Sequence, residues 1–138
     1  MSVAEVRRIS SGTTWEPVVG YSRAVAAGDF VFVSGCTSVD GAEFVHEGDA
    51  YAQTRQAISN AAGALAGLGA SLADVVQTRM YVTDISRWQE YGRAHGDVFG
   101  DVRPAATMIE VAALIEPGML VEIEVVAFRP GIGRASGP

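Results

Sequence analysis

The sequence predicts one α+β domain, in which a single mixed six-stranded sheet carries two helices on one of its faces. Three observations support this. The chain has 138 residues, the usual length of one compact domain. Hydrophobic residues make up 49% and charged residues 19%, enough apolar material for a core. Apolar residues alternate in some segments and recur at helical spacing in others. The domain is expected to span residues 1–129, with 130–138 as a flexible tail.

Three strands are expected before the first helix. Val3–Ile9 alternates weakly, as an edge strand does, and Ser22–Val25 and Phe30–Ser34 form a hairpin around residues 27–29. The segment after Gly35 is rich in acidic residues and is predicted to be a loop.

Two amphipathic helices follow. Asp49 is the expected N-cap of the first helix, which ends around Gly67 and Gly69. Ser86 and Gln89 resemble a capping box that starts the second helix. One face of the second helix is expected to carry Trp88, Tyr91, His95, Val98 and Phe99.

Three further strands complete the predicted sheet. A turn at Ser71–Asp74 leads into the β-branched segment Val75–Val82, which lies between the two helices in sequence. Ala105–Val111 and Leu120–Phe128 follow, joined by a turn at residues 116–118. The predicted order is therefore β-β-β-α-β-α-β-β.

The last strand has two unlike faces. One row is wholly apolar and consists of Val121, Ile123, Val125 and Ala127. The opposite row mixes the carboxylates Glu122 and Glu124 with Leu120, Val126 and Phe128. A face turned to water has little reason to carry such large apolar groups. We therefore expect it to meet another subunit, with binding sites at the interfaces.

Charge and residue usage exclude several kinds of chemistry. Sixteen acidic against ten basic residues give a net charge of −6, so no nucleic acid partner is expected. Every basic residue is an arginine. The chain therefore has no lysine for a Schiff base, for covalent pyridoxal phosphate or for a P-loop, and no cofactor is expected. Without an apolar leader or membrane span, a cytoplasmic location without a membrane partner is the expectation.

Cysteine and histidine offer little for catalysis. Cys36 is the single cysteine, which rules out an internal disulfide. It follows a strand, where a nucleophile can stand, but no histidine is near it in sequence, so buried filler is the favoured interpretation. His46 and His95 are too far apart in sequence to indicate a zinc site. A core or interface role is favoured for His95.

Three carboxylates are expected to lie on neighbouring strands. Glu122 and Glu124 share one strand face, and Glu110 lies on an adjacent strand. On a partly buried sheet such groups can hold raised pKa values and act as general acids or bases. The alternative is that they pair with arginines across a subunit boundary, since ion-pair networks perturb carboxylates just as readily.

Five sequence blocks, in a match that extends from about residue 3 to residue 129, resemble the RidA/YjgF family of reactive intermediate deaminases. The blocks are Gly20–Val25, Val31–Gly35, Arg103–Ala105, Glu110–Ala112 and Val121–Glu124. The resemblance implies a chorismate-mutase-like subunit and a homotrimer whose sheets line a central barrel, with three clefts between subunits. It also implies hydrolysis of reactive enamines and imines to keto acids and ammonia.

The resemblance assigns roles by position. Tyr21 corresponds to a tyrosine that shapes the cleft, Gly35 to a glycine of its backbone wall, and Glu122 to the glutamate that handles protons. Cys36 lies beside Gly35 and is included in the expected substrate-binding set.

Other positions depart from the family pattern. Ala106 stands where an arginine clamps the substrate carboxylate, and Met108 stands where a cysteine is frequent. An asparagine from the second helix falls at Gly92. Both Ala106 and Met108 are still expected to line the substrate site.

The missing arginine limits the functional inference. A methyl group supplies neither the charge nor the geometry of a bidentate guanidinium contact, a loss of about 2–5 kcal/mol in a desolvated cleft. Either Arg23, Arg79 or Arg103 enters the cleft instead, or the ligand lacks the carboxylate.

The leading functional hypothesis is a Rid-type hydrolase of altered specificity. Its ligand would be an imine, an enamine or a carbonyl metabolite bound between subunits. The alternative is a non-catalytic trimer that binds a metabolite. An endoribonuclease or translation inhibitor is the least favoured interpretation, because the chain is acidic and lacks paired histidines.

Overall fold

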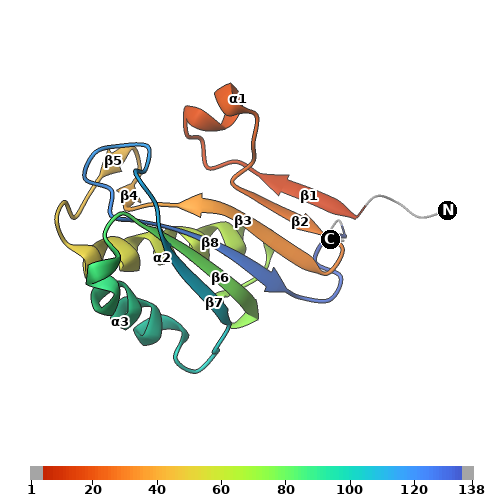
Figure 1. The fold of residues 1–138 in the computed structure, drawn as a ribbon. Helices are drawn as coiled ribbons and strands as arrows, with labels where there is room; N and C mark the ends of the chain where they lie inside the picture. The colour runs from red at the N-terminus through yellow and green to blue at the C-terminus, as the bar shows by residue number, and fades with distance from the viewer. Residues whose placement is uncertain (1–4, 135–138) are drawn as a thin grey trace.

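The computed structural model describes residues 5–134, and six strands in this part of the chain form one sheet in the order β1-β2-β3-β8-β6-β7 (Figure 1). Strands β6 and β7 pair in parallel, and all the other neighbours are antiparallel. The mixed six-stranded sheet is therefore confirmed. Its strands are β1 (Val6–Ile9), β2 (Ala24–Ala27), β3 (Phe30–Cys36), β6 (Val75–Val82), β7 (Ala105–Glu110) and β8 (Val121–Phe128).

Both long helices cover the same face of the sheet, as predicted (Figure 1). Helix α2 (Ala50–Leu68) packs its apolar side on β3 and β8, and Ile58, Leu65 and Ile123 are buried between them. Helix α3 (Trp88–Phe99) lies beside α2 and is tied to β6 by a hydrogen bond of 2.9 Å between His95 and Thr78. Neither these helices nor any other in residues 5–134 is long and apolar enough to cross a membrane.

The ends of α2 follow local rules. The Asp49 carboxylate accepts a hydrogen bond of 2.9 Å from the N–H of Ala52, which confirms the predicted N-cap. Gly69 ends the helix in the left-handed conformation, with φ of 93°. Gly67 lies inside the helix, not beyond it as expected. A Cβ there would stand 3.0 Å from Cδ1 of Ile9, so the glycine allows β1 to approach.

Two small elements were not predicted. A five-residue helix, α1 (Trp15–Val19), interrupts the long connection between β1 and β2. A short hairpin of β4 (Val39–Asp40) and β5 (Glu43–Phe44) replaces the loop expected after Gly35. Elements this short have too few residues for a hydrophobic period to be visible.

The predicted capping box of α3 is wrong. The N-cap of α3 is Arg87, which makes no side-chain capping hydrogen bond. The Asp84 side chain accepts a hydrogen bond of 3.0 Å from the N–H of Ser86 and caps a turn that comes before the helix. A single 3₁₀ turn, η2 (Ile85–Arg87), therefore precedes α3, much as η1 (Leu72–Asp74) precedes β6.

Packing continues beyond residue 129, where the flexible tail was expected to begin. Ile132 is buried, and its carbonyl accepts a hydrogen bond of 2.6 Å from Nη2 of Arg7. The N–H of Gly133 donates to the carbonyl of Gly28 over 2.7 Å. Residues 130–134 are thus held by partners more than 100 positions away in the chain, which no local pattern could show. The rest of the predicted tail, 135–138, lies outside the described residues.

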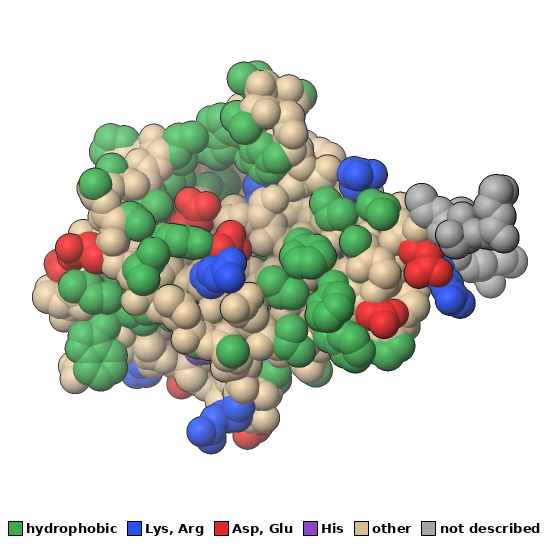
Figure 2. Space-filling model, turned by 45° about the vertical axis from the view of Figure 1, so that its right-hand side comes forward, with side chains coloured by type: hydrophobic (Ala, Val, Ile, Leu, Met, Phe, Trp, Pro, Cys, Tyr) green, Lys and Arg blue, Asp and Glu red, His purple; other side chains and the backbone are tan. Residues whose placement is uncertain are grey.

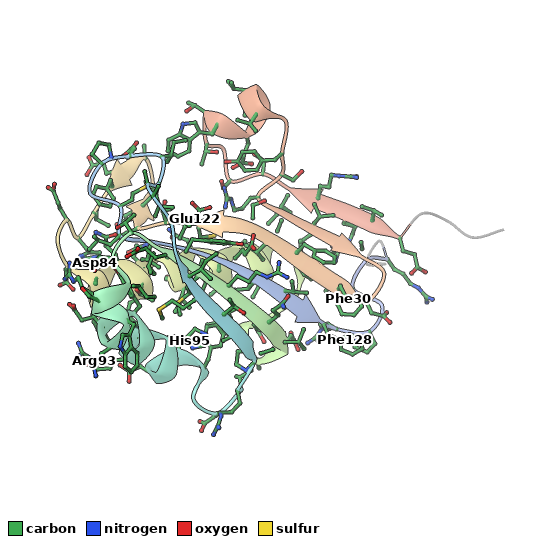
Figure 3. All side chains as sticks on the ribbon, in the orientation of Figure 1. Phe30, Asp84, Arg93, His95, Glu122 and Phe128 are labelled. Carbon is green, nitrogen blue, oxygen red and sulfur yellow. The ribbon has the colours of Figure 1, made fainter. Side chains whose placement is uncertain are left out.

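The face of the sheet opposite the helices is apolar at one end (Figures 2 and 3). Phe30, Phe32 and Phe128 are between 41% and 49% exposed there, and the Phe30 and Phe128 rings meet edge to face at 5.3 Å. Further along the same face, Tyr81 donates to Glu124 over 2.5 Å, and Arg79 lies 3.5 Å from Glu124. The two unlike rows predicted for β8 are present, since Val121, Ile123, Val125 and Ala127 are all buried.

Candidate functional site

A cavity of about 700 Å³ lies at the end of the sheet where β2 begins, β3 ends and β8 begins. The segment 10–21, which contains α1, forms one side, and α2 forms another. Figure 2 shows the hollow beneath the α1 segment, bordered by apolar side chains. The volume is within the range of small-molecule sites, roughly 300–1,000 Å³.

Most of the site residues predicted from the sequence line this cavity. They are Tyr21, Gly35, Cys36 and Glu122, together with one of the three replacement cations, Arg23. They come from the residues just before β2, the end of β3 and the start of β8, which meet because β3 pairs antiparallel with both β2 and β8.

Glu122 reaches the cavity across Gly35. A Cβ built on Gly35 would stand 1.7 Å from Oε2 of Glu122, so only glycine leaves room for this carboxyl group. A register shift between Val33 and Cys36, where β3 pairs with β8, falls at the same place. Glu122 can therefore hold this position because residue 35 on the neighbouring strand is a glycine and has no Cβ. Figure 3 shows Glu122 at the end of the sheet nearest α1.

The Glu122 carboxyl retains its proton more strongly than a free glutamate does. Burial is the largest cause and raises its pKa above the ordinary 4.5, and the nearby Glu124 raises it further. Arg23 opposes this shift without cancelling it. A carboxyl group that is more readily protonated than a free glutamate is suited to donating and recovering a proton.

Arg23 organises the polar end of the cavity. Its Nη1 donates to the carbonyls of Gly35 and Ser34, over 2.7 and 3.1 Å. Its Nη2 donates to the Tyr21 hydroxyl over 3.4 Å, and its guanidinium carbon lies 5.6 Å from the centre of the Tyr21 ring. The arginine thus fixes the end of β3 and the orientation of Tyr21.

Glu16 of α1, which sequence reasoning missed, lies behind Arg23. Its carboxylate is 3% exposed, stands 4.0 Å from Nε of Arg23, and accepts hydrogen bonds from the hydroxyls of Ser11 and Thr13. Burial tends to raise its pKa, but the hydrogen bonds from Ser11 and Thr13 outweigh burial and lower the pKa to about 2. Glu16 is therefore ionised and balances the charge of Arg23. The spacing of Thr13 and Glu16 resembles a capping box, a signal that could have indicated this short helix.

Cys36 forms part of the cavity wall as a protonated thiol. Burial raises its pKa, although Arg23 partly opposes this, and Sγ donates to the carbonyl of Ser34 over 3.4 Å. A nucleophilic cysteine needs the opposite shift. The structure therefore favours the interpretation of Cys36 as a buried packing residue and not as a nucleophile.

The remaining predicted residues lie away from the cavity in this chain. Ala106 and Met108 belong to β7, and β8 and β6 separate that edge strand from β3. The three strand spacings amount to about 14 Å. Arg79 pairs with Glu124 on the open face, and Arg103 precedes β7 with a positive φ of 56°. The predicted site is thus divided into two groups on one chain.

The other candidate groups have structural partners. His95 bonds to Thr78, and its ring lies 4.7 Å from the Phe99 ring; burial lowers its pKa, so it is a neutral packing residue. Glu110 accepts a hydrogen bond of 3.0 Å from the N–H of Ile85. Within residues 5–134 no three His, Cys, Asp or Glu side chains gather in a way that could hold a metal ion.

The fold and the cavity together define a class of protein: an α+β subunit with a protonatable glutamate at the open end of its sheet. The Endoribonuclease L-PSP family model matches residues 12–129, and the chain belongs to this family, which is the RidA/YjgF family expected from the sequence.

Several relatives agree with this assignment. An uncharacterized Streptomyces coelicolor protein is 39% identical over 132 residues, which cover 96% of this chain and 98% of the relative. The 3-aminoacrylate deaminase RutC of Acinetobacter baylyi is 33% identical over 112 residues, 80% of this chain and 88% of that protein.

A solved structure has the same fold at closer similarity. A YjgF-family protein of Mycobacterium tuberculosis superposes with a TM-score of 0.82 at 50% identity, over 89% of this chain and 98% of that one. A Pseudomonas aeruginosa protein of unknown function gives a TM-score of 0.80 at 27% identity, over 97% and 100% of the two chains.

Proposed function

We propose that this protein is a Rid-type hydrolase that converts a small imine or enamine to a carbonyl compound and ammonia, with Glu122 as the proton-handling group. The observation that carries the proposal is the Glu122 carboxyl, whose pKa burial raises, at the wall of a cavity that Tyr21 and Gly35 also line. The deaminase name of the RutC relative supports the same class of reaction.

The residues account for each proton in the reaction. Protonated Glu122 donates its proton to the enamine carbon and leaves an iminium ion. Water then adds to the iminium carbon. The hydroxyl proton of the resulting carbinolamine passes to its amino nitrogen, and the carbon–nitrogen bond breaks to give the carbonyl product and ammonia. The Glu122 carboxylate recovers a proton in the course of water addition and is ready for another cycle. The Tyr21 hydroxyl accepts from Arg23, so its own O–H is free to donate to the ligand.

The charges around the cavity favour a substrate without a carboxylate. Arg23 already donates to two carbonyls and to Tyr21, and Glu16 balances its charge. It therefore offers no free bidentate fork of the kind that a carboxylate needs. Ala106 offers no charge at all.

We further propose that the working form is a homotrimer. The open face of the sheet exposes Phe30, Phe32 and Phe128, which a second copy would cover. Ala106 and Met108 would then approach the cavity from the edge strand of a neighbouring subunit, which would join the two groups of predicted site residues in one cleft.

The test is ammonia release from freshly generated imines and enamines, including matched compounds with and without a carboxylate. We expect release above the buffer rate, fastest for the uncharged compounds. Glu122→Gln should lower kcat by about 10²–10⁴-fold, the contribution of general acid–base catalysis. Glu110→Gln is the matched control, because Glu110 bonds to the N–H of Ile85 outside the cavity. Folded protein that releases no ammonia from any compound would refute the proposal.

A metabolite-binding trimer without catalysis is the second candidate. It is favoured by Ala106 and Gly92, which replace polar groups of the family pattern. In that case Glu122→Gln would change affinity while no turnover exists in either form. We do not propose endoribonuclease activity, because no histidine lines the cavity and the chain carries a net charge of −6.

A further inference from the structure

The cavity is much larger than a small imine requires. A ligand of six non-hydrogen atoms, each occupying about the 30 Å³ of a water molecule, would fill about 180 Å³. The cavity holds about 700 Å³. Most of its space is therefore available to a part of the ligand that does not react.

This additional space extends along α2. Ser59, Gly63 and Gly67 line the cavity at intervals of four residues, so they follow one another along one face of the helix. From Ser59 to Gly67 the helix rises about 12 Å. A Cβ placed on Gly63 would have no atom within 4 Å, so the glycine leaves an open trough. Together with Ile9 and Ala64, these three residues form what we call the α2 arm.

The α2 arm differs in chemistry from the reacting end. Among residues 5–134, Arg23 and Glu122 are the only charged side chains that line the cavity, and both stand at the polar end. Ile9 and Ala64 are apolar, and Trp15, Val19 and Ile115 add further apolar walls to the cavity. Ser59, Gly63 and Gly67 are exposed, so the arm is an open groove whose lining offers no charged partner to a charged group.

We propose that the α2 arm is a subsite for the apolar body of an elongated substrate, whose imine or carbonyl carbon lies at Glu122. The substrate class is thus an amphipathic imine or ketone with an uncharged alkyl or aromatic chain. The position of the reacting carbon rests on the proposed function, whereas the apolar subsite rests on the shape and chemistry of the arm.

The test is the binding of unreactive methyl ketones of increasing length, from 2-butanone to 2-octanone, followed by calorimetry or ligand-observed NMR. Each methylene that enters an apolar site lowers Kd by about fourfold. We expect this gain to continue through the series. A Kd that does not change with chain length would overturn the proposal.

Substitutions on α2 test where the chain binds. Gly63→Leu and Ser59→Leu each fill the arm and should remove most of the length-dependent gain, while 2-butanone binds as before. Leucine favours helix at both positions, so the helix itself is not weakened. Ala66→Leu is the matched control, since Ala66 is exposed like Ser59 and Gly63 but does not line the cavity. If both arm variants keep the full gain, the arm is not the subsite.

The two proposals fail separately. Ketone binding needs no chemistry, so Glu122→Gln should retain the dependence on chain length. Ketone binding that strengthens with chain length, without ammonia release from any imine, would refute the hydrolase proposal and support the apolar subsite. Ammonia release, together with a ketone Kd that does not change with chain length, would support the hydrolase proposal and refute the apolar subsite.

Discussion

The Glu122 carboxyl can reach the cavity because Gly35, on the neighbouring strand, has no side chain. The Glu122 carboxyl occupies the space of a Gly35 side chain. The sequence indicated both residues through a resemblance, but only the pairing of β3 with β8 shows that they depend on each other.

Gly35→Ala should displace the Glu122 carboxyl, because the added Cβ would stand 1.7 Å from Oε2. We expect turnover to fall by about 10²-fold or more, approaching the effect of Glu122→Gln. The measurement is kcat with circular dichroism as a check of the fold. Gly96→Ala is the control, since its new methyl group meets no atom within 4 Å and Gly96 does not line the cavity. Full activity in Gly35→Ala would show that the position of Glu122 does not matter.

The pH dependence of activity should report on Glu122. Its pKa is raised by burial first and by Glu124 second. If the protonated acid is the active form, the rate falls as pH rises through this pKa. Glu124→Gln removes a negative charge beside Glu122, so it should lower the Glu122 pKa. The fall in rate at rising pH should then begin at a lower pH. The measurement is kcat/KM against pH, with Glu110→Gln as a variant that leaves this pH unchanged. A shift to higher pH would contradict the assignment.

At the scale of elements, the segment 10–21 is held by one buried carboxylate. Glu16 accepts from Ser11 and Thr13 and stands 4.0 Å from Arg23. The hydrophobic pattern gave no sign of α1, because five residues make little more than one turn. Regular elements such as α2 and β8 were predictable, since each has enough residues to show its period.

Glu16→Gln should loosen this segment and destabilise the fold by about 1.5–3 kcal/mol, the range for hydrogen bonds to a charged group. The pKa of Glu16 is about 2 in the folded chain against an ordinary 4.5. Its contribution is therefore complete above about pH 4.5 and is lost as pH falls toward 2. The measurement is urea unfolding of both proteins at pH 7 and at pH 3. The difference in unfolding free energy should be smaller at pH 3, and a larger one would contradict the prediction.

At the scale of the whole molecule, the open face of the sheet is the feature that a monomer does not explain. Phe32 is 49% exposed on a strand whose other side is in the core. Such a face is stable in water when another copy covers it.

Phe32→Glu should convert the proposed trimer to monomer, because it places a charge in an apolar interface. Light scattering coupled to size exclusion measures the mass directly. Ala66→Glu adds the same charge on the helix side and should leave the assembly intact. A wild-type protein that is itself monomeric would refute the proposed assembly and the shared cleft.

The order of the main strands and helices, the N-cap of α2 and the buried row of β8 were all readable from the sequence, because each rests on residues close together in the chain. The cavity was not, since its walls come from β1, the segment 10–23, β3, α2 and β8, which only the folded chain brings together. The same holds for residues 130–134, whose partners lie more than 100 positions away in the chain. The carbonyls that accept from Arg23 lie only 11 and 12 positions away, but they meet it only once β2 pairs with β3. Periodicity records which side of an element faces the core, while long-range pairing decides which side chains meet.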